Sequence, residues 1–548
     1  FLSFGSCFIV PGCHGFARGR QASYKKLKYP KLGDIVVPEV ERVALPNGMR
    51  LFLLEDHELP LINISTRIRT GSVYEPADKI GLASITGIVM RTGGTTSKTG
   101  DQIDEELEQI AASVETGIGL NSGYASMSVL KEDIDTGLAI LADVLMNPAF
   151  REDKIELAKV QHRSSIARRN DEVSQIAGRE YIKLIYGPES VYARHTEYAT
   201  IDNISREDLI AFHKQLYFPN NMMLSVCGDF DSKEIVKKIA KAFADWKSSD
   251  IEVPPVPQVD YEFRPTVNEI HKDDINQACI RLGHIGCLMS DPDYFALIVM
   301  NRILGGGFTS RLFKNVRSRE GLAYSVFGNY SADFDHPGVF YVGCQTKSES
   351  TVHAIRAMVR EVEKMTESEV TDEELAIAKE AYLNSFVFNF DSKREIVNRL
   401  LVYDYFGYPA DFLQKTKENV EKVTKADVLR VARKHLRPDK VQILAVGRPA
   451  DFDEPLSVLG EVKEIDITIP VPKEELPTAT DETTTKGREL LAKAVSACGG
   501  AEAFAAIDIS SKIRSDKMRT NKSFVMMVFI FLSFGSCFIV PGCHGFAR

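Results

Sequence analysis

An arginine and a tyrosine follow three consecutive glycines in the second half of the chain, and together they could bind a polar ligand. The glycines are Gly305–Gly307, and the pair is Arg317 and Tyr324. Glycine adopts backbone conformations closed to other residues and allows another chain to approach closely. Seven residues apart, the pair would share one face of a helix or converge on one ligand across a helix-to-strand corner. The alternative is that Arg317 is a solvated helix charge and Tyr324 a half-buried core aromatic, and spacing alone leaves both readings open.

The histidines form no recognisable zinc pattern. His57-Glu58 begins the His-Glu-x-x-His motif of zinc peptidases, but Leu61 stands in the place of the second histidine. The others are scattered along the chain, and His162, on a polar helix, is expected to be solvated. A zinc site needs three convergent protein ligands and an open position. We therefore expect no metal site in this chain.

The composition is that of a soluble globular protein. Of 548 residues, 44% are hydrophobic and 26% charged, so two or more cores are expected. A net charge of -9 without a long Lys/Arg cluster excludes a general nucleic-acid binder. Nine cysteines without a CxxC pair indicate neither a disulfide scaffold nor a four-thiolate zinc site. Four cysteines in apolar, strand-like runs are expected to be buried: Cys227, Cys279, Cys287 and Cys344.

The two ends of the chain carry one repeated string. Residues 1–18 and 531–548 are identical, and a start-like Met518, a basic stretch and an apolar run to Val540 lead into the second copy. That order is the layout of a secretory signal peptide. It predicts export to the bacterial periplasm.

A membrane or lipid anchor is the alternative role for this end of the chain. The apolar run is at the lower limit for spanning a bilayer. Val540-Pro541-Gly542-Cys543 loosely resembles a bacterial lipoprotein cleavage site. Either feature would hold the exported protein at a membrane.

The order of the apolar patterns predicts an α+β fold. Alternation on both sides of Pro46-Asn47-Gly48 is a hairpin signal, and a third strand is expected over residues 61–69. Helical spacing of apolar residues follows over residues 81–90 and 101–114. Strands followed by helices indicate layers of sheet and helix.

An internal repeat predicts two homologous domains. Residues 204–228 align without gaps on residues 423–447. Each copy begins with a hydroxyl residue and an aspartate three positions later, which is a helix-start box. These residues are Ser205 with Asp208, and Thr424 with Asp427.

A proline-rich linker lies between the copies, and a threonine-rich, polar stretch follows the second. The expected division is a leader remnant over 1–36, an N-terminal domain over 37–252, a linker over 253–265, a C-terminal domain over 266–470, a tether and short helical segment over 471–517, and a signal-peptide-like segment over 518–548 that duplicates residues 1–18.

Residues 304–326, LGGGFTSRLFKNVRSREGLAYSV, resemble a signature of the pitrilysin/insulinase and mitochondrial processing peptidase families, which are zinc peptidases with an inverted motif. The likeness extends through most of residues 38–470 and is greatest to bacterial two-chain members. It implies two homologous domains, each a mostly antiparallel sheet packed with helices, that form half of a clamshell peptidase chamber.

The resemblance implies roles for the loop and the pair. In relatives the arginine and tyrosine hold the substrate backbone and stabilise the oxyanion of the tetrahedral intermediate, which suits a fixed guanidinium and a phenol donor. Arg317 and Tyr324 would thus act on a zinc site in a partner chain. The residues implied to bind substrate are Gly305, Gly306, Gly307, Ser310 and Arg311.

The zinc motif of the family is lost. Active relatives carry His-x-x-Glu-His after Gly-Leu-Ala, with two histidine ligands and a glutamate base. Here Ser84 and Ile88 stand in place of the histidines and Gly87 in place of the base. The third ligand, a glutamate, aligns best with Ser164 or Ser165. This chain should therefore not hydrolyse peptides alone.

The leading hypothesis is a non-catalytic, substrate-binding subunit of a two-chain zinc metallopeptidase. Its partners would be a homologous zinc-bearing subunit and unfolded peptides, which would add as a strand to a sheet edge. No cofactor is expected in this chain, and zinc is expected in the partner. The rival is a non-enzymatic peptide-binding or assembly protein of the same fold, and an independent peptidase with unusual ligands is a third possibility.

Overall fold

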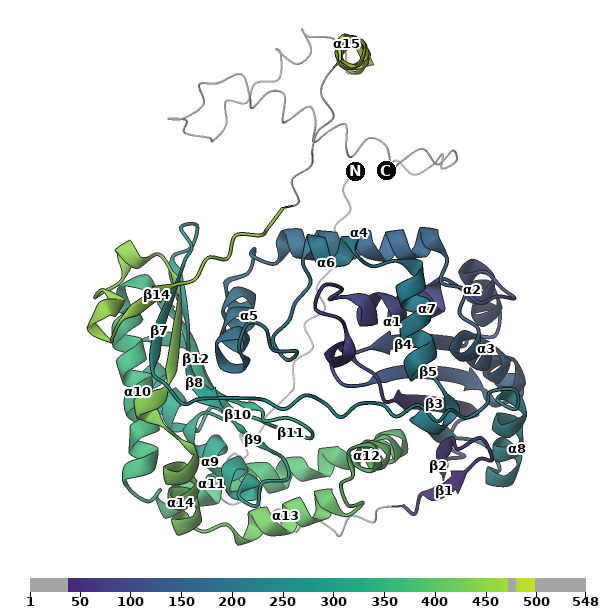
Figure 1. Ribbon diagram of the computed structural model, residues 1–548. Coiled ribbons are helices and arrows are strands. Elements are labelled where there is room, and N and C mark those ends of the chain that lie inside the picture. Colours follow the sequence, from purple (N-terminus) through teal and green to yellow (C-terminus); the bar gives the residue numbers. More distant parts are fainter. Residues whose placement is uncertain (1–37, 472–479, 498–548) are drawn as a thin grey trace, which may run out of the picture. The chain divides into compact units, whose positions relative to one another are not determined.

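Two six-stranded sheets, one on each side of the linker, form the framework of the chain (Figure 1). The computed structural model describes residues 38–471 and 480–497. Contacts divide the chain into two units, Phe1–Pro472 and Lys473–Arg548, and both sheets belong to the first. We call the sheet before the linker, with its helices, the first lobe, and the sheet after it the second lobe.

The first sheet is mostly antiparallel, as predicted, with the order β1-β2-β6-β3-β5-β4 and one parallel pair, β2 and β6. The expected hairpin is confirmed, because β1 and β2 pair antiparallel around Gly48, whose φ is 85°. The strands are β1 Glu41–Ala44, β2 Arg50–Glu55, β3 Leu61–Ile68, β4 Ser113–Ile118, β5 Gly123–Leu130 and β6 Met222–Gly228.

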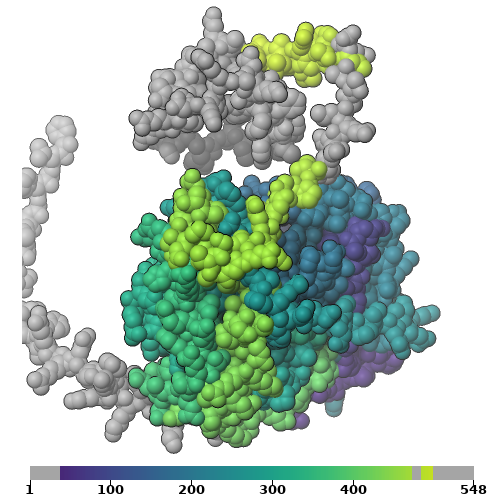
Figure 2. All heavy atoms as spheres, turned by 60° about the vertical axis from the view of Figure 1, so that its left-hand side comes forward, coloured from purple at the N-terminus to yellow at the C-terminus, as the bar shows by residue number. Residues whose placement is uncertain are grey.

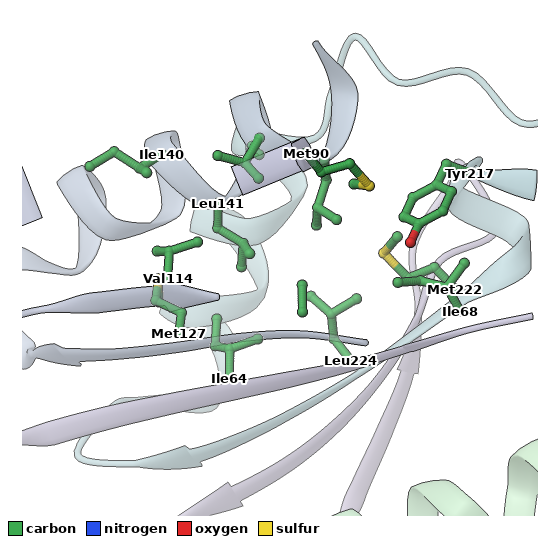
Figure 3. Close-up of a cluster of buried hydrophobic side chains, with 14 of the residues drawn as sticks. Ile64, Ile68, Met90, Val114, Met127, Ile140, Leu141, Tyr217, Met222 and Leu224 are labelled. Carbon is green, nitrogen blue, oxygen red and sulfur yellow. The ribbon is translucent and has the colours of Figure 1, made fainter. Parts of the chain in front are cut away.

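Helices cover one face of this sheet and enclose the main core of the first lobe. Figure 3 shows apolar side chains from β3, β4, β5 and β6 meeting those of the helices above, among them Ile64, Leu224 and Met90. The alternating burial of β3 explains this, because every second side chain of the strand turns to that face. These helices are α1 Leu82–Thr92, α2 Gly100–Gln109, α3 Ile134–Met146, α4 Glu152–Arg168, α6 Tyr198–Asp202, α7 Arg206–Leu216 and α8 Ser232–Ala242. The remaining helix of the first lobe, α5 Val173–Tyr186, packs on the second sheet.

The helix expected over residues 101–114 is shorter than predicted. It ends at Gln109, and Ala111 takes a positive φ of 49°. From Ser113 the burial of the side chains follows the two-residue period of a strand, so the apolar Val114 belongs to β4 rather than to the helix.

The second sheet repeats the plan of the first. Its order is β10-β12-β8-β13-β7-β14, and its parallel pairs are β13 with β7 and β7 with β14. The strands are β7 Thr266–His271, β8 Gln277–Ile285, β10 Ala323–Tyr330, β12 Val339–Lys347, β13 Gln442–Gly447 and β14 Val462–Glu464, with a separate pair, β9 Cys287–Leu288 and β11 Ala332–Asp333.

The second lobe also has its own helices and a core between them and the sheet. A short π-helix, Phe313–Arg319, precedes β10. The α-helices are α9 Tyr294–Leu304, α10 Thr351–Glu367, α11 Asp372–Phe386, α12 Lys393–Phe406, α13 Phe412–Lys422 and α14 Lys425–His435.

The repeated segments form the same unit in both lobes. One runs from α7 into β6 and the other from α14 into β13. The predicted capping boxes are confirmed, because Ser205 and Thr424 each accept a hydrogen bond from the backbone N–H of the aspartate three positions on. The four cysteines expected in the core are buried and free, as predicted.

One helix of each lobe packs on the sheet of the other lobe. Helix α5 of the first lobe packs on β8 and β13, where Tyr181 is fully buried beside Leu444 (Figure 1). Helix α12 of the second lobe packs on β2 and β6, where Leu401 and Tyr405 cover Phe52. Each sheet is therefore covered on its second face by a helix from the opposite half of the chain.

The last residues of the second lobe also tie the lobes together. Asn170, after α4, donates its side-chain N–H to the Ile467 carbonyl at 2.7 Å. Ile465 and Ile467 pack beside α5, and Ile469 packs against the core of the first lobe. In Figure 2 the yellow-green end of the second lobe lies on the surface where the green and the blue parts of the chain meet.

We expect residues 38–252 expressed alone not to fold cooperatively. Without α12, the apolar face of Phe52, Leu54 and Met223 would be exposed to water. Burying each such side chain contributes about 1.5–3 kcal/mol, and a whole domain is stable by only about 5–15 kcal/mol. The fragment should bind a hydrophobic dye and lack a sharp thermal transition, unlike residues 38–471. A transition matching that of the longer chain would contradict the mutual dependence of the lobes.

The second unit is described only over residues 480–497, which include helix α15, Asp481–Ala497. The leader-like segments over residues 1–36 and 518–548, and the signal peptide and anchor expected from them, lie outside the described residues. Within residues 38–471 and 480–497, no helix has the length and apolar content needed to cross a membrane.

Candidate functional site

The glycine-rich loop begins where α9 ends and crosses the backbone of β10. The Gly305 N–H donates to the Asn301 carbonyl at 2.9 Å. A Cβ on Gly305 would lie 2.3 Å from the Gly328 nitrogen, and one on Gly306 would lie 2.8 Å from the Arg302 Cα. Both glycines are therefore needed for packing within this chain. Gly307 is exposed, and a Cβ there would meet no atom within 4 Å, so it alone lies open to another chain.

Ser310 and Arg311 support the loop and do not present free side chains to a substrate. Ser310 is buried, and its Oγ accepts a hydrogen bond from the Phe313 N–H at 3.3 Å, where the π-helix begins. Arg311 donates from Nε and from a terminal nitrogen to the two Glu374 oxygens at 2.7 and 3.0 Å. The direct substrate contact implied for these residues does not fit this arrangement.

The Arg311–Glu374 pair makes stability depend on pH. Its hydrogen bonds, with those from Thr371, lower the pKa of Glu374 to about 2. Because an unfolded glutamate titrates near pH ~4.3, the stabilisation is present above that pH and is lost as the pH falls toward 2. We expect Arg311→Ala to lower the free energy of unfolding by about 1–3 kcal/mol at pH 7, and by less at pH 3. Urea unfolding at both pH values measures this, with the exposed Arg319→Ala as control. An equal loss at both pH values would exclude the ion pair as the cause.

Arg317 and Tyr324 meet across the corner between the π-helix and β10. The Arg317 guanidinium carbon lies 4.9 Å from the centre of the Tyr324 ring and 4.4 Å from that of Phe313. Tyr324 is 84% exposed, which rules out the alternative of a half-buried core aromatic. The two rings hold the guanidinium between them through cation–π contacts.

The guanidinium of Arg317 is free for a ligand. In the described part of the chain, no carboxylate forms an ion pair with it and no side chain accepts a hydrogen bond from it. The Tyr324 hydroxyl likewise has no hydrogen-bond partner among the described residues. A planar cation with fixed N–H groups and a phenol donor thus face the same exposed corner.

A β-bulge directs Tyr324 outward. Ala323 pairs with Thr346 and Ser325 with Gln345, so Tyr324 is the extra residue between two ladder positions. Such a bulge redirects a side chain and bends the strand. β10 is also the edge strand of its sheet, which leaves one row of backbone N–H and C=O groups unpaired by the sheet.

Two aromatic residues of this corner were not predicted from the sequence. Phe313 contacts Arg317, and Phe308, which is 78% exposed, packs edge-to-face on Phe313 with ring centres 5.1 Å apart. Phe313 lies four residues before Arg317 in the sequence, and this helical spacing was the available signal. Nothing in the local sequence marks Phe308.

The positions of the lost zinc motif lie at the contact between α1 and α4. Ser84 Oγ lies 3.3 Å from His162 Nε2. His162 is half-buried and burial lowers its pKa, so the expectation of a solvated histidine is wrong. Ser164 and Ser165 are exposed, and His162 takes the position facing α1 that was assigned to them.

A catalytic zinc does not fit this place. A Cβ on Gly87 would lie 2.5 Å from the Ile118 nitrogen on β4, and the Gly87 carbonyl accepts a 2.6 Å hydrogen bond from Thr116. Helix α1 therefore lies against the strand where the side chain of a general base would have to be. Ser84 and Ile88 add no nitrogen ligand, which leaves His162 alone.

A second group of metal-ligating types, Asp291, Asp293 and His435, lies in the second lobe. The two Asp293 oxygens already accept hydrogen bonds from Arg430, Lys434 and His435 at 2.6–2.8 Å. These contacts occupy the lone pairs that a metal would need, and the positive charges of Arg430 and Lys434 repel it. We therefore assign this group to an ion-pair network that joins α14 to the start of α9.

Models of two parts of one peptidase family match the chain. The insulinase model, of peptidase family M16, matches residues 51–186, and the peptidase M16 inactive domain model matches residues 203–382. Together the matched residues make up more than half of the chain. The chain belongs to peptidase family M16.

Curated relatives align with more than half of the chain. An uncharacterized zinc protease of Rickettsia felis is 26% identical over 61% of this chain and 80% of its own length. The non-peptidase homolog YmxG of Helicobacter pylori is 24% identical over 77% of this chain and 94% of its own length. The probable mitochondrial-processing peptidase subunit beta of Arabidopsis thaliana is 24% identical over 76% and 80%.

A solved structure shows the same fold. The crystal structure of a peptidase M16 inactive domain from Pseudomonas fluorescens superimposes with a TM-score of 0.69 at 23% identity, covering 76% of this chain and 100% of that chain. The M16 resemblance expected from the glycine-rich loop is confirmed, and so is the fold of mostly antiparallel sheets packed with helices.

Proposed function

We propose that this M16 chain is the non-catalytic, substrate-binding subunit of a two-chain zinc metallopeptidase that acts on unfolded peptides. The observation that carries the proposal is the meeting of Arg317, on the π-helix, with Tyr324, on an edge strand, with the guanidinium unpaired in the described chain. A scaffold protein has no need of this arrangement. The close contact of Gly87 with β4 leaves no space for the side chain of a general base at that position, which supports a base and a metal supplied by a partner chain.

The partner would be a homologous chain with an intact His-x-x-Glu-His motif. One relative is named as the beta subunit of a processing peptidase and another as a non-peptidase homolog, which supports a division of labour between paired chains. In this arrangement each chain forms half of a closed chamber. Zinc on the partner would activate water and polarise the scissile carbonyl.

Within the chamber, this chain would bind the peptide backbone and stabilise negative charge. An extended peptide can pair with the edge of β10 next to Tyr324, before Gly328 and Tyr330, whose N–H groups already donate to Gly305 and Asn301. Such pairing requires unfolded segments and tolerates many sequences. The Tyr324 hydroxyl would donate to the oxygen that becomes negative in the transition state. The Arg317 guanidinium, held between two rings, would donate to the same region at little cost in conformational entropy.

Activity of the mixed chains tests the proposal. An unstructured fluorogenic peptide is incubated with this chain, with a candidate zinc-bearing M16 partner, and with both. We expect cleavage well above the sum of the separate rates only in the mixture. If the mixture forms a complex but is no more active than the partner alone, the proposal fails, and the peptide-binding or assembly role takes its place.

A further inference from the structure

The second sheet carries a charge without a counter-charge on the face that α5 partly covers. Arg281 lies in the middle of β8, between Gly343 of β12 and Leu444 of β13. In the described residues it forms no ion pair, and its buried Nε lacks a hydrogen-bond partner. Its one polar contact is with the Tyr341 ring, whose centre lies 4.9 Å from the guanidinium carbon.

The guanidinium is closely bordered on two sides. A terminal nitrogen of Arg281 lies 3.3 Å from where a Cβ on Gly178 of α5 would stand, and the Phe327 ring lies 3.2 Å from the Cβ position of Gly343. Phe327 packs edge-to-face on Tyr341 at 5.8 Å and forms an apolar flank. Arg281 itself is only half-buried, so part of its side chain remains exposed to solvent.

The equivalent place in the first lobe is neutral and fully satisfied. Ser65 pairs with Ser225 there, as Arg281 pairs with Leu444, and the repeat aligns Ser225 with Leu444. The Ser225 hydroxyl contacts the Ser65 carbonyl at 3.2 Å and the side chain of Asn398 on α12. Arg67 and Arg69 of the first lobe lie against Tyr405 of α12 and also form no ion pair among the described residues. They donate to Ser122 and to the Tyr405 carbonyl, however, whereas the buried Nε of Arg281 has no acceptor among the described residues.

Arg281 shares a face of the sheet with residues next to the candidate site. Phe327 pairs with Gly343, and Gly343 with Arg281, so these three form one row across the sheet. The row before it contains the exposed Ser325 and Gln345, directly after the Tyr324 bulge. Strand spacing places the Arg281 backbone roughly 10 Å in from the edge strand, a distance that a peptide spans in about three or four residues where it leaves the edge and crosses this face of the sheet.

We infer that Arg281 is a specificity residue that binds a carboxylate of the peptide a few residues from the bond held by Arg317 and Tyr324. A half-buried guanidinium without an acid partner gains charge-assisted, bidentate hydrogen bonds when a carboxylate arrives. The carboxylate is that of an acidic side chain or of the peptide C-terminus. This inference rests on the proposed function, because it presumes that peptides bind on this lobe.

Binding of labelled peptides to the full chain tests the inference. The probes are fluorescein-labelled, unstructured 12-residue peptides with an amidated C-terminus and one Glu at each position in turn, with Gln counterparts. A further probe has no Glu but a free C-terminal carboxylate. We expect one or two registers, or the free C-terminus, to bind about five- to tenfold more tightly than the neutral counterpart. Fluorescence anisotropy gives the Kd.

Arg281→Met keeps the length of the side chain and removes the charge, and Arg281→Lys keeps a charge without the planar fork. We expect Arg281→Met to abolish the preference while neutral peptides bind as before, and Arg281→Lys to retain part of it. Thermal unfolding shows whether the variants fold. A preference that survives Arg281→Met, or none in any register, overturns the inference while leaving the proposed function intact. If no peptide binds and the mixture is no more active than the partner alone, both this inference and the proposed function are wrong.

Discussion

Arg317→Ala is expected to lower the kcat of the two-chain peptidase about 10²- to 10³-fold, the usual cost of removing one donor that stabilises the transition state. The guanidinium lies between Phe313 and Tyr324 and has no carboxylate partner in the described chain, so its removal leaves no buried charge unpaired. Its loss should act on turnover more than on KM, because a donor to the oxyanion works mainly in the transition state. Steady-state kinetics of the mixed chains measures both constants.

Tyr324→Phe separates the hydroxyl from the ring. Phenylalanine keeps the ring that contacts Arg317 and removes only the donor, so the geometry of the corner is preserved. A similar fall in kcat would assign the effect to the hydroxyl. Full activity would limit Tyr324 to positioning Arg317 and would contradict the donor role.

The matched control for both variants is Arg319→Ala. Arg319 is an exposed arginine on the same π-helix, two residues beyond Arg317. We expect it to leave kcat within about twofold, since a solvated surface charge contributes little. Analytical ultracentrifugation should show the same complex with every variant. Equal losses in Arg319→Ala and Arg317→Ala would indicate a general effect of surface charge.

Rebuilding the zinc motif is expected to fail at Gly87. A glutamate there would place its Cβ 2.5 Å from the Ile118 nitrogen and 2.8 Å from the Gly117 carbonyl carbon, and both are backbone atoms that cannot turn away. Overpacking of this kind costs about 1–3 kcal/mol, and a poorly solvated carboxylate adds to it. We expect Ser84→His/Gly87→Glu/Ile88→His to lose at least about 3 kcal/mol of stability and to show no peptidase activity alone.

The double variant Ser84→His/Ile88→His is the control. Both positions are only partly buried, so the two imidazoles can be accommodated where Gly87→Glu cannot. Urea unfolding should therefore show that the double variant keeps most of the stability that the triple variant loses, so that most of the loss comes from Gly87→Glu. Gly87→Ala should be destabilised by about 1–3 kcal/mol on its own. A stable, active triple variant would show that α1 moves freely from β4 and would overturn this account.

The elements that the sequence predicted correctly depend on neighbours along the chain. The hairpin at Gly48 and the capping boxes at Ser205 and Thr424 rest on contacts within about four residues, and side-chain type and spacing report these directly. The repeat adds the two-lobe plan, since the same local signals recur in the same order. The end of α2, at Gln109, was predicted too late in the chain. Val114 fits both the helical and the strand period, and only the pairing of β4 with β5 assigns it to a strand.

The candidate site also has a part that local sequence predicts and a part that depends on distant contacts. The types and spacing of Arg317 and Tyr324 identified the pair, and the resemblance supplied its role. Whether the two side chains meet depended on the bulge at Tyr324, which exists only because β10 pairs with β12. Ser310 and Arg311 were assigned to the substrate, but the distant Glu374 and the burial of Ser310 turn both toward the framework of the loop.

By itself, the sequence determined the α+β class, the two homologous lobes and the identity of the Arg/Tyr pair, because each follows from residue type and short-range order. The loss of the zinc ligands was inferred from the resemblance to the family. Tertiary structure alone decided that α5 and α12 each cover the sheet of the opposite lobe, that α1 closes on β4 at Gly87, and that Arg281 has no counter-charge among the described residues. Those features depend on contacts between residues far apart in the chain. Packing and charge pairing between residues far apart in the sequence are set when the whole chain folds, so local sequence patterns do not predict them.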